Sequence, residues 1–203
     1  MKTIVTILVA TSVLLAFSAH AQQTVNGCQI KRKTSCPGVN LSGANLVKSN
    51  LSGADLAGAN LSGANLSADK ITEANLIKAN LSNANLSDAN LSETYLTGAN
   101  LSHANLARAN LSQSSLPDAN LKEANLAGAN LSLANLKGAD LTGVNAKGAV
   151  FLMASLVNAN FTRADLTEAT LVGSDLRNAI LEGATFCKTT MPDRTVNNSG
   201  CPK

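Results

Sequence analysis

Aromatic side chains are nearly absent from this sequence. Its 203 residues include no Trp, one Tyr and four Phe. Aromatic rings supply much of the bulk of an ordinary globular core, so their scarcity argues against a wide interior. A narrow interior of smaller apolar side chains needs no such bulk, and apolar residues still make up 45% of the chain. The length suits a single domain.

Residues that could carry out catalysis are also few. Beyond residue 21 the one histidine is His103, which has Ser and Ala as sequence neighbours and is expected to be solvated. The sequence offers no recognisable Cys–His or Ser–His–Asp set and no phosphate-binding glycine loop. Glu73 and Glu93 are 20 residues apart and occupy the same position in the repeat described below. Two acids on a solvated surface nevertheless make a weak acid–base site. We therefore predict a protein that is not an enzyme and has no cofactor.

Residues 1–21 have the pattern of a secretory signal peptide. Lys2 supplies a short positive region, residues 4–17 form an apolar run, and Ala19-His20-Ala21 is a small-x-small cleavage site. The run is short for a transmembrane helix, although an uncleaved anchor is the alternative. We predict that the mature protein begins near Gln22 and is exported to the periplasm or the extracellular space. We expect no stable membrane insertion after cleavage.

A period of five residues organises the rest of the chain. From Leu41 to Phe186 every fifth residue is apolar, and these 30 positions hold 25 Leu, three Phe, Ile71 and Ala146. The residue two places earlier is small, being Ala in 23 of the 30 repeats, and Asn or Asp usually stands between the two. No insertion interrupts the count, so the pattern predicts a wound chain whose repeats stack on one another.

A period of five residues matches neither the 3.6-residue period of a helix nor the two-residue period of a plain strand. They can form three extended residues, with the small residue and the Leu pointing inward, followed by a two-residue corner. Eleven of the 14 Gly lie two residues after the central apolar residue, where a corner needs a permissive backbone. The sequence therefore predicts an all-β solenoid.

Runs such as Ala44-Asn45-Leu46, Ala54-Asp55-Leu56 and Ala164-Asp165-Leu166 resemble the motif A-(D/N)-L-x-x of the pentapeptide-repeat family. The resemblance covers residues 39–188. It implies a right-handed, four-sided β-helix with four pentapeptides in each coil, and hence about seven and a half coils in which residues 20 apart stack. We expect residues 22–38 to form an N-terminal cap segment and residues 189–203 a C-terminal one.

Four cysteines stand at the two ends of the repeat. Export makes disulfides reasonable, and four cysteines allow three pairings. If the chain is the rod that the resemblance implies, the two ends lie too far apart to be bridged. The expected bonds are then Cys28–Cys36 and Cys187–Cys201, each tying down a terminal segment. Oxidised cysteines cannot serve as the usual zinc ligands, and we predict no metal site.

Several inward positions depart from the pattern. Asp69 occupies a position where Ala is usual, with Ser49 expected directly beneath it. Either Ser49 and backbone N–H groups satisfy its carboxylate, or the coil bulges and turns it outward, which we favour. Thr94 and Ser114 are also inward and could hydrogen-bond to each other. Ala146 stands at a central position where Leu is usual and leaves space. Val144 and Phe151 are larger than the usual Ala and Leu at their positions, and we interpret them as compensation for the lost volume.

A cluster of apolar residues falls on predicted outward positions of one face. We call it the contact patch, and it consists of Leu133, Val150, Leu152, Met153 and Val172. Contiguous exposed apolar surface often marks an interaction site, and a dimer could form through it. The alternative is that the C-terminal segment folds back and covers it.

Two ladders of hydroxyl residues could bind a repetitive ligand such as a polysaccharide, but small hydroxyl residues also suit turn positions. The ladders consist of Ser52, Thr72, Ser92, Ser112 and Ser132, and of Ser42, Ser62, Ser82 and Ser102.

The preferred functional prediction is an exported protein-interaction or surface-scaffolding module whose partner is an unknown protein or glycan. The family resemblance suggests an alternative, a DNA-mimicking inhibitor or protector of a topoisomerase. That function requires a cytoplasmic protein with an acidic surface, whereas residues 39–188 hold 12 acids and 10 bases. We also expect no binding of nucleic acid, because the basic run at residues 31–33 has no interleaved aromatics.

Overall fold

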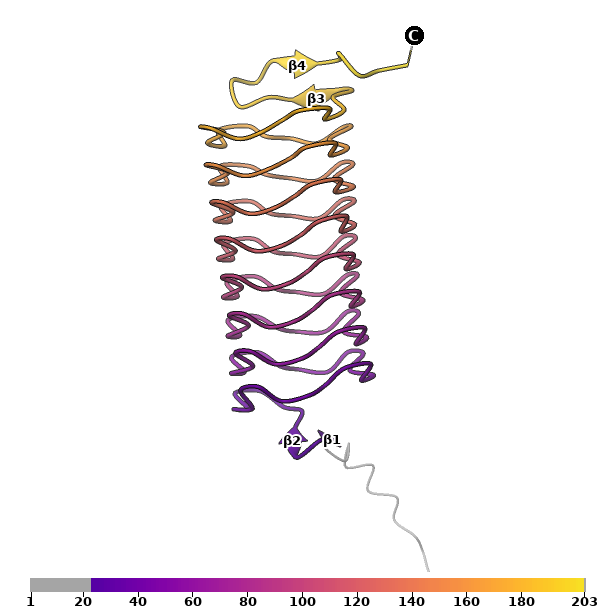
Figure 1. Cartoon of the computed structure of the whole chain (residues 1–203), viewed down its shortest axis with the longest axis vertical. Coiled ribbons are helices and arrows are strands. Elements are labelled where there is room, and N and C mark those ends of the chain that lie inside the picture. Colours follow the sequence, from indigo (N-terminus) through magenta and orange to yellow (C-terminus); the bar gives the residue numbers. More distant parts are fainter. Residues whose placement is uncertain (1–22, 203) are drawn as a thin grey trace, which may run out of the picture.

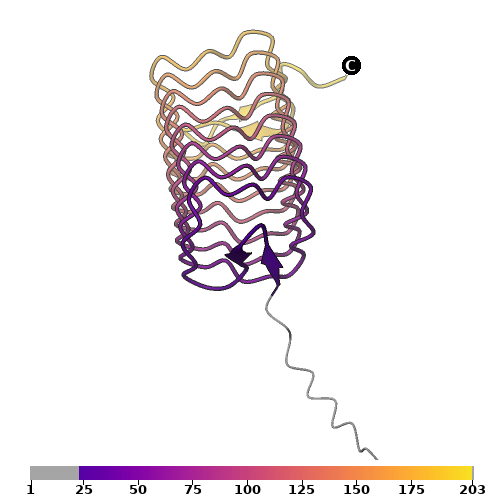
Figure 2. The same ribbon diagram turned by 60° about the horizontal axis from the view of Figure 1, so that its bottom comes forward.

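The computed structural model describes residues 23–202, so the predicted signal peptide at 1–21 lies outside the described residues. The described residues wind into a single rod of stacked coils, with strands β1 (Thr24–Val25) and β2 (Cys28–Gln29) at one end of the rod and β3 (Thr189–Thr190) and β4 (Val196–Asn197) at the other (Figure 1). Figure 2, tilted to bring the N-terminal end forward, shows the coils winding round a common axis. Among the described residues no helix has the length and apolar character needed to cross a membrane.

The predicted coil of four five-residue units is confirmed by the pairing of the backbone. Parallel bridges join residues that are 20 apart, beginning with Ser35↔Asp55 and ending with Thr170↔Thr190. The ladder thus reaches a few residues beyond the repeat bounds 39–188 at both ends. A 20-residue register corresponds to four pentapeptides per coil, and the fold is the right-handed quadrilateral β-helix that the resemblance implied.

Each five-residue unit folds as the pattern predicts. Leu56 and Ala59 are fully buried, as are nearly all the inward Leu and Ala residues. The N–H of Leu56 donates to the carbonyl of Asn75 in the next coil at 2.8 Å, and the N–H of Asn75 donates back to Ala54 at 2.8 Å. The second corner residue has a positive φ, 64° at Gly58, and this conformation explains the preference for Gly there.

The outward Asn residues form hydrogen-bonded ladders that the sequence analysis did not predict. The Oδ1 atom of Asn85 accepts the N–H of Ser87 at 3.2 Å, which closes the corner. Its Nδ2 group donates to Oδ1 of Asn65 in the coil below at 3.1 Å, and Asn105 donates to Asn85 in the same way at 3.2 Å. An amide can donate and accept together, whereas a carboxylate only accepts. This double role explains why Asn outnumbers Asp at the position.

A hairpin covers the N-terminal end of the rod. Strands β1 (Thr24–Val25) and β2 (Cys28–Gln29) pair antiparallel through a turn at Asn26 and Gly27, both with positive φ. The backbone twist of such a two-residue turn matches the twist of the two strands that it connects. The predicted Cys28–Cys36 disulfide is present. Asn26 Nδ2 donates to the carbonyl of Asn40 at 2.6 Å and so satisfies part of the coil's open edge.

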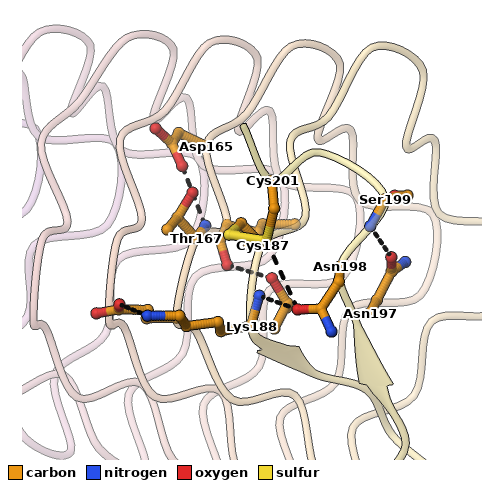
Figure 3. The surroundings of a disulfide bond; sticks show 11 residues. Asp165, Thr167, Cys187, Lys188, Asn197, Asn198, Ser199 and Cys201 are labelled. Carbon is orange, nitrogen blue, oxygen red and sulfur yellow. Dashed lines mark hydrogen bonds and ion pairs between the residues drawn. A yellow bond between two sulfur atoms is a disulfide. The ribbon is translucent and has the colours of Figure 1, made fainter. Parts of the chain in front are cut away.

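A second hairpin lies on the C-terminal end, formed by β3 (Thr189–Thr190) and β4 (Val196–Asn197) in antiparallel pairing. The predicted Cys187–Cys201 disulfide joins it to the last coil (Figure 3). Oδ1 of Asn198 accepts the N–H of Lys188 at 2.9 Å. The cover is partial, because Leu176 and Leu181 are only half-buried. Within residues 23–202, their N–H groups have no hydrogen-bond acceptor.

Asp69 corrects our expectation of a bulge. Its side chain points inward and is 1% exposed, and the 20-residue register runs through it without a break, as the Asn50↔Lys70 and Lys70↔Asn90 bridges show. Ser49 Oγ donates to Oδ2 at 2.7 Å and the N–H of Lys70 donates to Oδ1 at 2.6 Å. These two hydrogen bonds make an inward carboxylate tolerable where an unpaired one would not be. Burial nevertheless raises the pKa of Asp69 to about 6, despite the opposing effect of these hydrogen bonds.

Thr94 and Ser114, which could have hydrogen-bonded to each other, do not do so. Each hydroxyl instead donates to a carbonyl three residues earlier in its own coil, Thr94 to Leu91 at 2.7 Å and Ser114 to Leu111 at 2.5 Å. The local acceptor is already positioned by the corner, so each group is satisfied without its neighbour. Val144, Ala146 and Phe151 are all buried, as the interpretation of volume compensation requires.

The raised pKa of Asp69 predicts a pH dependence of stability. A carboxyl group whose pKa is higher in the folded state than in the unfolded state favours folding at low pH, and this contribution is lost as the pH rises. The free energy of unfolding should therefore fall between about pH 4 and the folded-state pKa of about 6. The Asp69→Asn variant keeps the shape of the side chain without its charge. Its free energy of unfolding at pH 7 should exceed that of the parent by about 2–3 kcal/mol. Chemical denaturation across this pH range measures both effects.

Ser49→Ala provides the matched comparison. It removes a hydrogen bond that lowers the pKa of Asp69, so the decline in stability should extend to higher pH. Equal pH profiles for the parent and Asp69→Asn would contradict a role for this buried carboxyl group.

The disulfides predict local rather than global stabilisation. In a solenoid each coil contacts only its neighbours, so a Cys187→Ser/Cys201→Ser variant should loosen β3, β4 and the coil beneath them. Loss of a disulfide that closes a loop of this size lowers the free energy of unfolding by about 3 kcal/mol. Hydrogen exchange should show lost protection at this end only, and Cys28→Ser/Cys36→Ser should show it at the other. Uniform loss along the rod would exclude this view.

Candidate functional site

The contact patch lies on the outside of the rod, as the sequence predicted. Leu133, Leu152 and Met153 are 53%, 40% and 61% exposed, while Val150 and Val172 are half-buried. Most other outward positions carry Asn, Ser, Thr or charged side chains. The cluster is therefore the main apolar interruption of a polar surface along the described coils.

Backbone pairing shows that the patch is continuous from coil to coil. The N–H of Leu133 donates to the carbonyl of Leu152 at 2.8 Å, and the N–H of Met153 donates to Val172 at 2.9 Å. A Cβ atom built on Gly173 would lie 3.3 Å from Cγ of Met153, so the Met153 side chain leans over the bare glycine of the next coil. The patch thus occupies one corner of consecutive coils together with the face beside it.

The patch begins where an amide ladder stops. Asn130 donates to Asn110, and Asn110 to Asn90, each at 3.3 Å. The next residue of this column is Val150, which can neither continue the ladder nor accept the N–H of Leu152. Apolar residues here have replaced groups that stabilise other faces.

The alternative in which the C-terminal segment covers the patch is wrong. The segment continues the stack, because the N–H of Gly173 donates to the carbonyl of Pro192 at 3.0 Å. Strand β4 then adds to the patch, since Val196 pairs with Thr190, which stacks above Thr170 and Val150. Val196 is 58% exposed. Sequence reasoning missed Val196 because it lies outside the five-residue period.

Charged residues in the same coils pair with one another on the neighbouring faces. The pairs are Lys147–Asp165 at 3.2 Å, Lys188–Glu168 at 3.5 Å and Arg177–Asp175 at 2.6 Å. Hydrogen bonds from Arg177 hold the pKa of Asp175 below its ordinary value. The patch therefore has an apolar centre and a polar rim whose charges are largely compensated, as protein interfaces commonly do.

The other candidate groups remain scattered over the surface. His103 faces Glu123 at 3.5 Å, with both side chains about half exposed. No three metal-ligating side chains of residues 23–202 converge on one point. The hydroxyl residues occupy corners whose backbone N–H groups bond to Asn, as at Ser112 and Asn110. Among the described residues, surface hollows beside Lys48 and Lys70 and near the Cys28–Cys36 bond lie away from the patch.

Comparison with known proteins places the chain in a family. A family model for pentapeptide repeats matches eight copies, over residues 35–68, 74–113, 114–151 and 154–191. No curated protein matches the chain.

Solved structures that resemble the chain include three proteins, two of which are described as pentapeptide repeat proteins. A pentapeptide repeat protein of the Arabidopsis thaliana thylakoid lumen is 35% identical, with 48% of this chain and 68% of that one covered and a TM-score of 0.47. HetL, involved in heterocyst differentiation regulation in the cyanobacterium Nostoc, is 28% identical, with 81% and 90% covered and a TM-score of 0.28. The plasmid-mediated fluoroquinolone resistance protein QnrB1 is 19% identical, with 74% and 90% covered and a TM-score of 0.48.

The family model accounts for most residues between 35 and 191, and its repeats coincide with the 20-residue ladder of the structure. The chain is a member of the pentapeptide-repeat family.

Proposed function

We propose that this protein is an exported, non-catalytic binding module that holds a partner protein against the contact patch. The family's fold is generally a structural or binding scaffold rather than an enzyme. The observation that carries the proposal is the exposure of large apolar side chains at Leu133, Leu152 and Met153. The largest contiguous apolar surface of a monomer is often a binding site.

Backbone conformation strengthens this argument. Leu133 and Met153 have φ values of 61° and 55°, a left-handed conformation that disfavours residues with a Cβ by about 1 kcal/mol. Glycine fills the same corner position in many other coils. Polar residues such as Lys78 and Gln113 have the same positive φ at other corners, so what sets Leu133 and Met153 apart is apolar surface that the fold leaves exposed.

Export rests on the N-terminal pattern and on the cysteines. Disulfides persist in oxidising compartments, and both pairs are formed in the structure. A near-neutral surface suits neither mimicry of DNA nor binding of nucleic acid. Likeness to QnrB1 at 19% identity concerns the fold alone, and no observation favours the hydroxyl ladders as a glycan site.

Export can be tested by mass. The protein recovered from the periplasm or medium of an expressing bacterium should have the intact mass of residues 22–203 less four hydrogens for the two disulfides. Loss of the leader removes one cation, Lys2, and leaves a formal charge of +2 from the 16 cations and 13 anions. A cytoplasmic species that retains residues 1–21 would exclude this route.

Partner capture tests the patch. Immobilised mature protein should retain a partner from the envelope or medium of its own cell, and Leu133→Gly/Met153→Gly should retain at least tenfold less. The glycine introduced at each position suits a positive φ, so the fold should persist or become more stable. Asn158→Gly is the matched control, because Asn158 has a φ of 59° at a corner outside the patch. A captured protein counts only when, once identified and purified, it binds the parent and not the variant; capture unaffected by the patch substitutions would refute the proposal.

A further inference from the structure

The contact patch is one part of a longer track along a single corner of the rod. Below Leu133 the same corner carries Gln113, Glu93 and Glu73. Consecutive hydrogen bonds connect these coils, from Glu73 N–H to the Ser92 carbonyl at 3.1 Å, from Glu93 to Ser112 at 3.0 Å and from Gln113 to Ser132 at 2.9 Å. The corner therefore changes from acidic to apolar along one straight line.

The two acids of this track differ from the acids near the patch. Asp165, Glu168 and Asp175 each have a cationic partner within 4 Å. Neither Glu73 nor Glu93 forms an ion pair within residues 23–202. Both belong to exposed corners, so the track offers a partner two carboxylates that form no ion pair within residues 23–202.

The dimensions of the patch favour a narrow partner. From Leu133 to Val196 the patch crosses about four coil spacings, or roughly 20 Å at ~4.8 Å per coil. One face holds three extended residues and is therefore about 10 Å wide, which gives the patch an area of a few hundred Å². A stable dimer interface buries about 800 Å² on each partner, so a second copy of this chain would be held weakly. A single extended segment matches the shape.

Building on the proposed function, we propose that the contact patch and the Glu73–Glu93 track bind an extended segment of a partner protein. That segment has alternating apolar side chains at one end and two basic side chains at the other. Alternate residues of an extended chain point the same way, so its apolar side chains can face Leu133, Met153 and Val172. The two basic residues lie two and four positions beyond the last apolar one, because only alternate residues face the rod. At ~3.3 Å per residue these positions are about 7 and 13 Å along the segment, within side-chain reach of Glu93 and Glu73, which lie about 10 and 14 Å from Leu133.

Synthetic peptides test this assignment on the mature, disulfide-bonded protein. The probe has three alternating leucines followed by two lysines at that spacing, and is labelled for fluorescence anisotropy. One control peptide replaces the lysines with glutamates, and another replaces the leucines with serines. The leucine–lysine peptide should bind at least tenfold more tightly than either control, and its affinity should fall as salt is added.

Two variants separate the parts of the site. Glu73→Gln/Glu93→Gln should remove most of the preference for lysine over glutamate in the peptide while leaving the apolar contribution. Leu133→Gly/Met153→Gly should weaken both peptides that contain leucine. Asn158→Gly should change neither.

Other results would overturn the inference in distinguishable ways. Equal binding of the lysine and glutamate peptides would remove the acidic track and leave the patch as the binding surface. Absence of peptide binding, with patch-dependent capture of a partner intact, would exclude an extended segment without affecting the proposed function. A sedimentation mass that doubles at micromolar concentration, and returns to monomer in Leu133→Gly/Met153→Gly, would identify a second copy as the occupant.

Discussion

Every feature of this molecule depends on a backbone register of 20 residues. Each coil donates and accepts hydrogen bonds above and below, as Leu56, Asn75 and Ala54 illustrate. An insertion of one residue would shift all later inward side chains to the outside, so the period of five is kept without exception over 30 repeats. The interior can vary only in volume and polarity, as at Ala146 and Asp69. Corners and outward positions are free to vary, and binding specificity can develop there without altering the fold.

The sequence determined the architecture because its period repeats so often. Leu, Ala, Asn and Gly each occupy a position whose burial or φ explains the preference, and the family resemblance supplied the coil size. Pairing of the cysteines followed from the length of the rod. The orientation of Asp69 could not be predicted in the same way, because it depends on whether two donors, Ser49 and the N–H of Lys70, converge on one carboxylate. Local geometry likewise decides that the hydroxyls of Thr94 and Ser114 donate to backbone carbonyls of their own coils and not to each other.

The candidate site was visible in the sequence only as an exception to the repeat. Counting by fives placed the five residues of the contact patch outward, and the structure places them there. The direction taken by the C-terminal segment lies outside any periodic rule, so the choice between a covered and an open patch needed coordinates. Val196 and the half-buried Leu176 and Leu181 at the partly covered end were missed for the same reason.

The amide ladders have a consequence for the chemical lifetime of the protein. Asparagine deamidates when the backbone nitrogen of the following residue attacks its side-chain carbonyl. In the coils that nitrogen is engaged, as where Leu86 donates to the carbonyl of Asn105 at 2.7 Å while the Asn85 amide bonds to its neighbours. A rod this rich in asparagine is thereby protected against the ageing reaction to which its composition would otherwise expose it. Asn26, followed by Gly27 in the hairpin turn, is the place where such damage should begin.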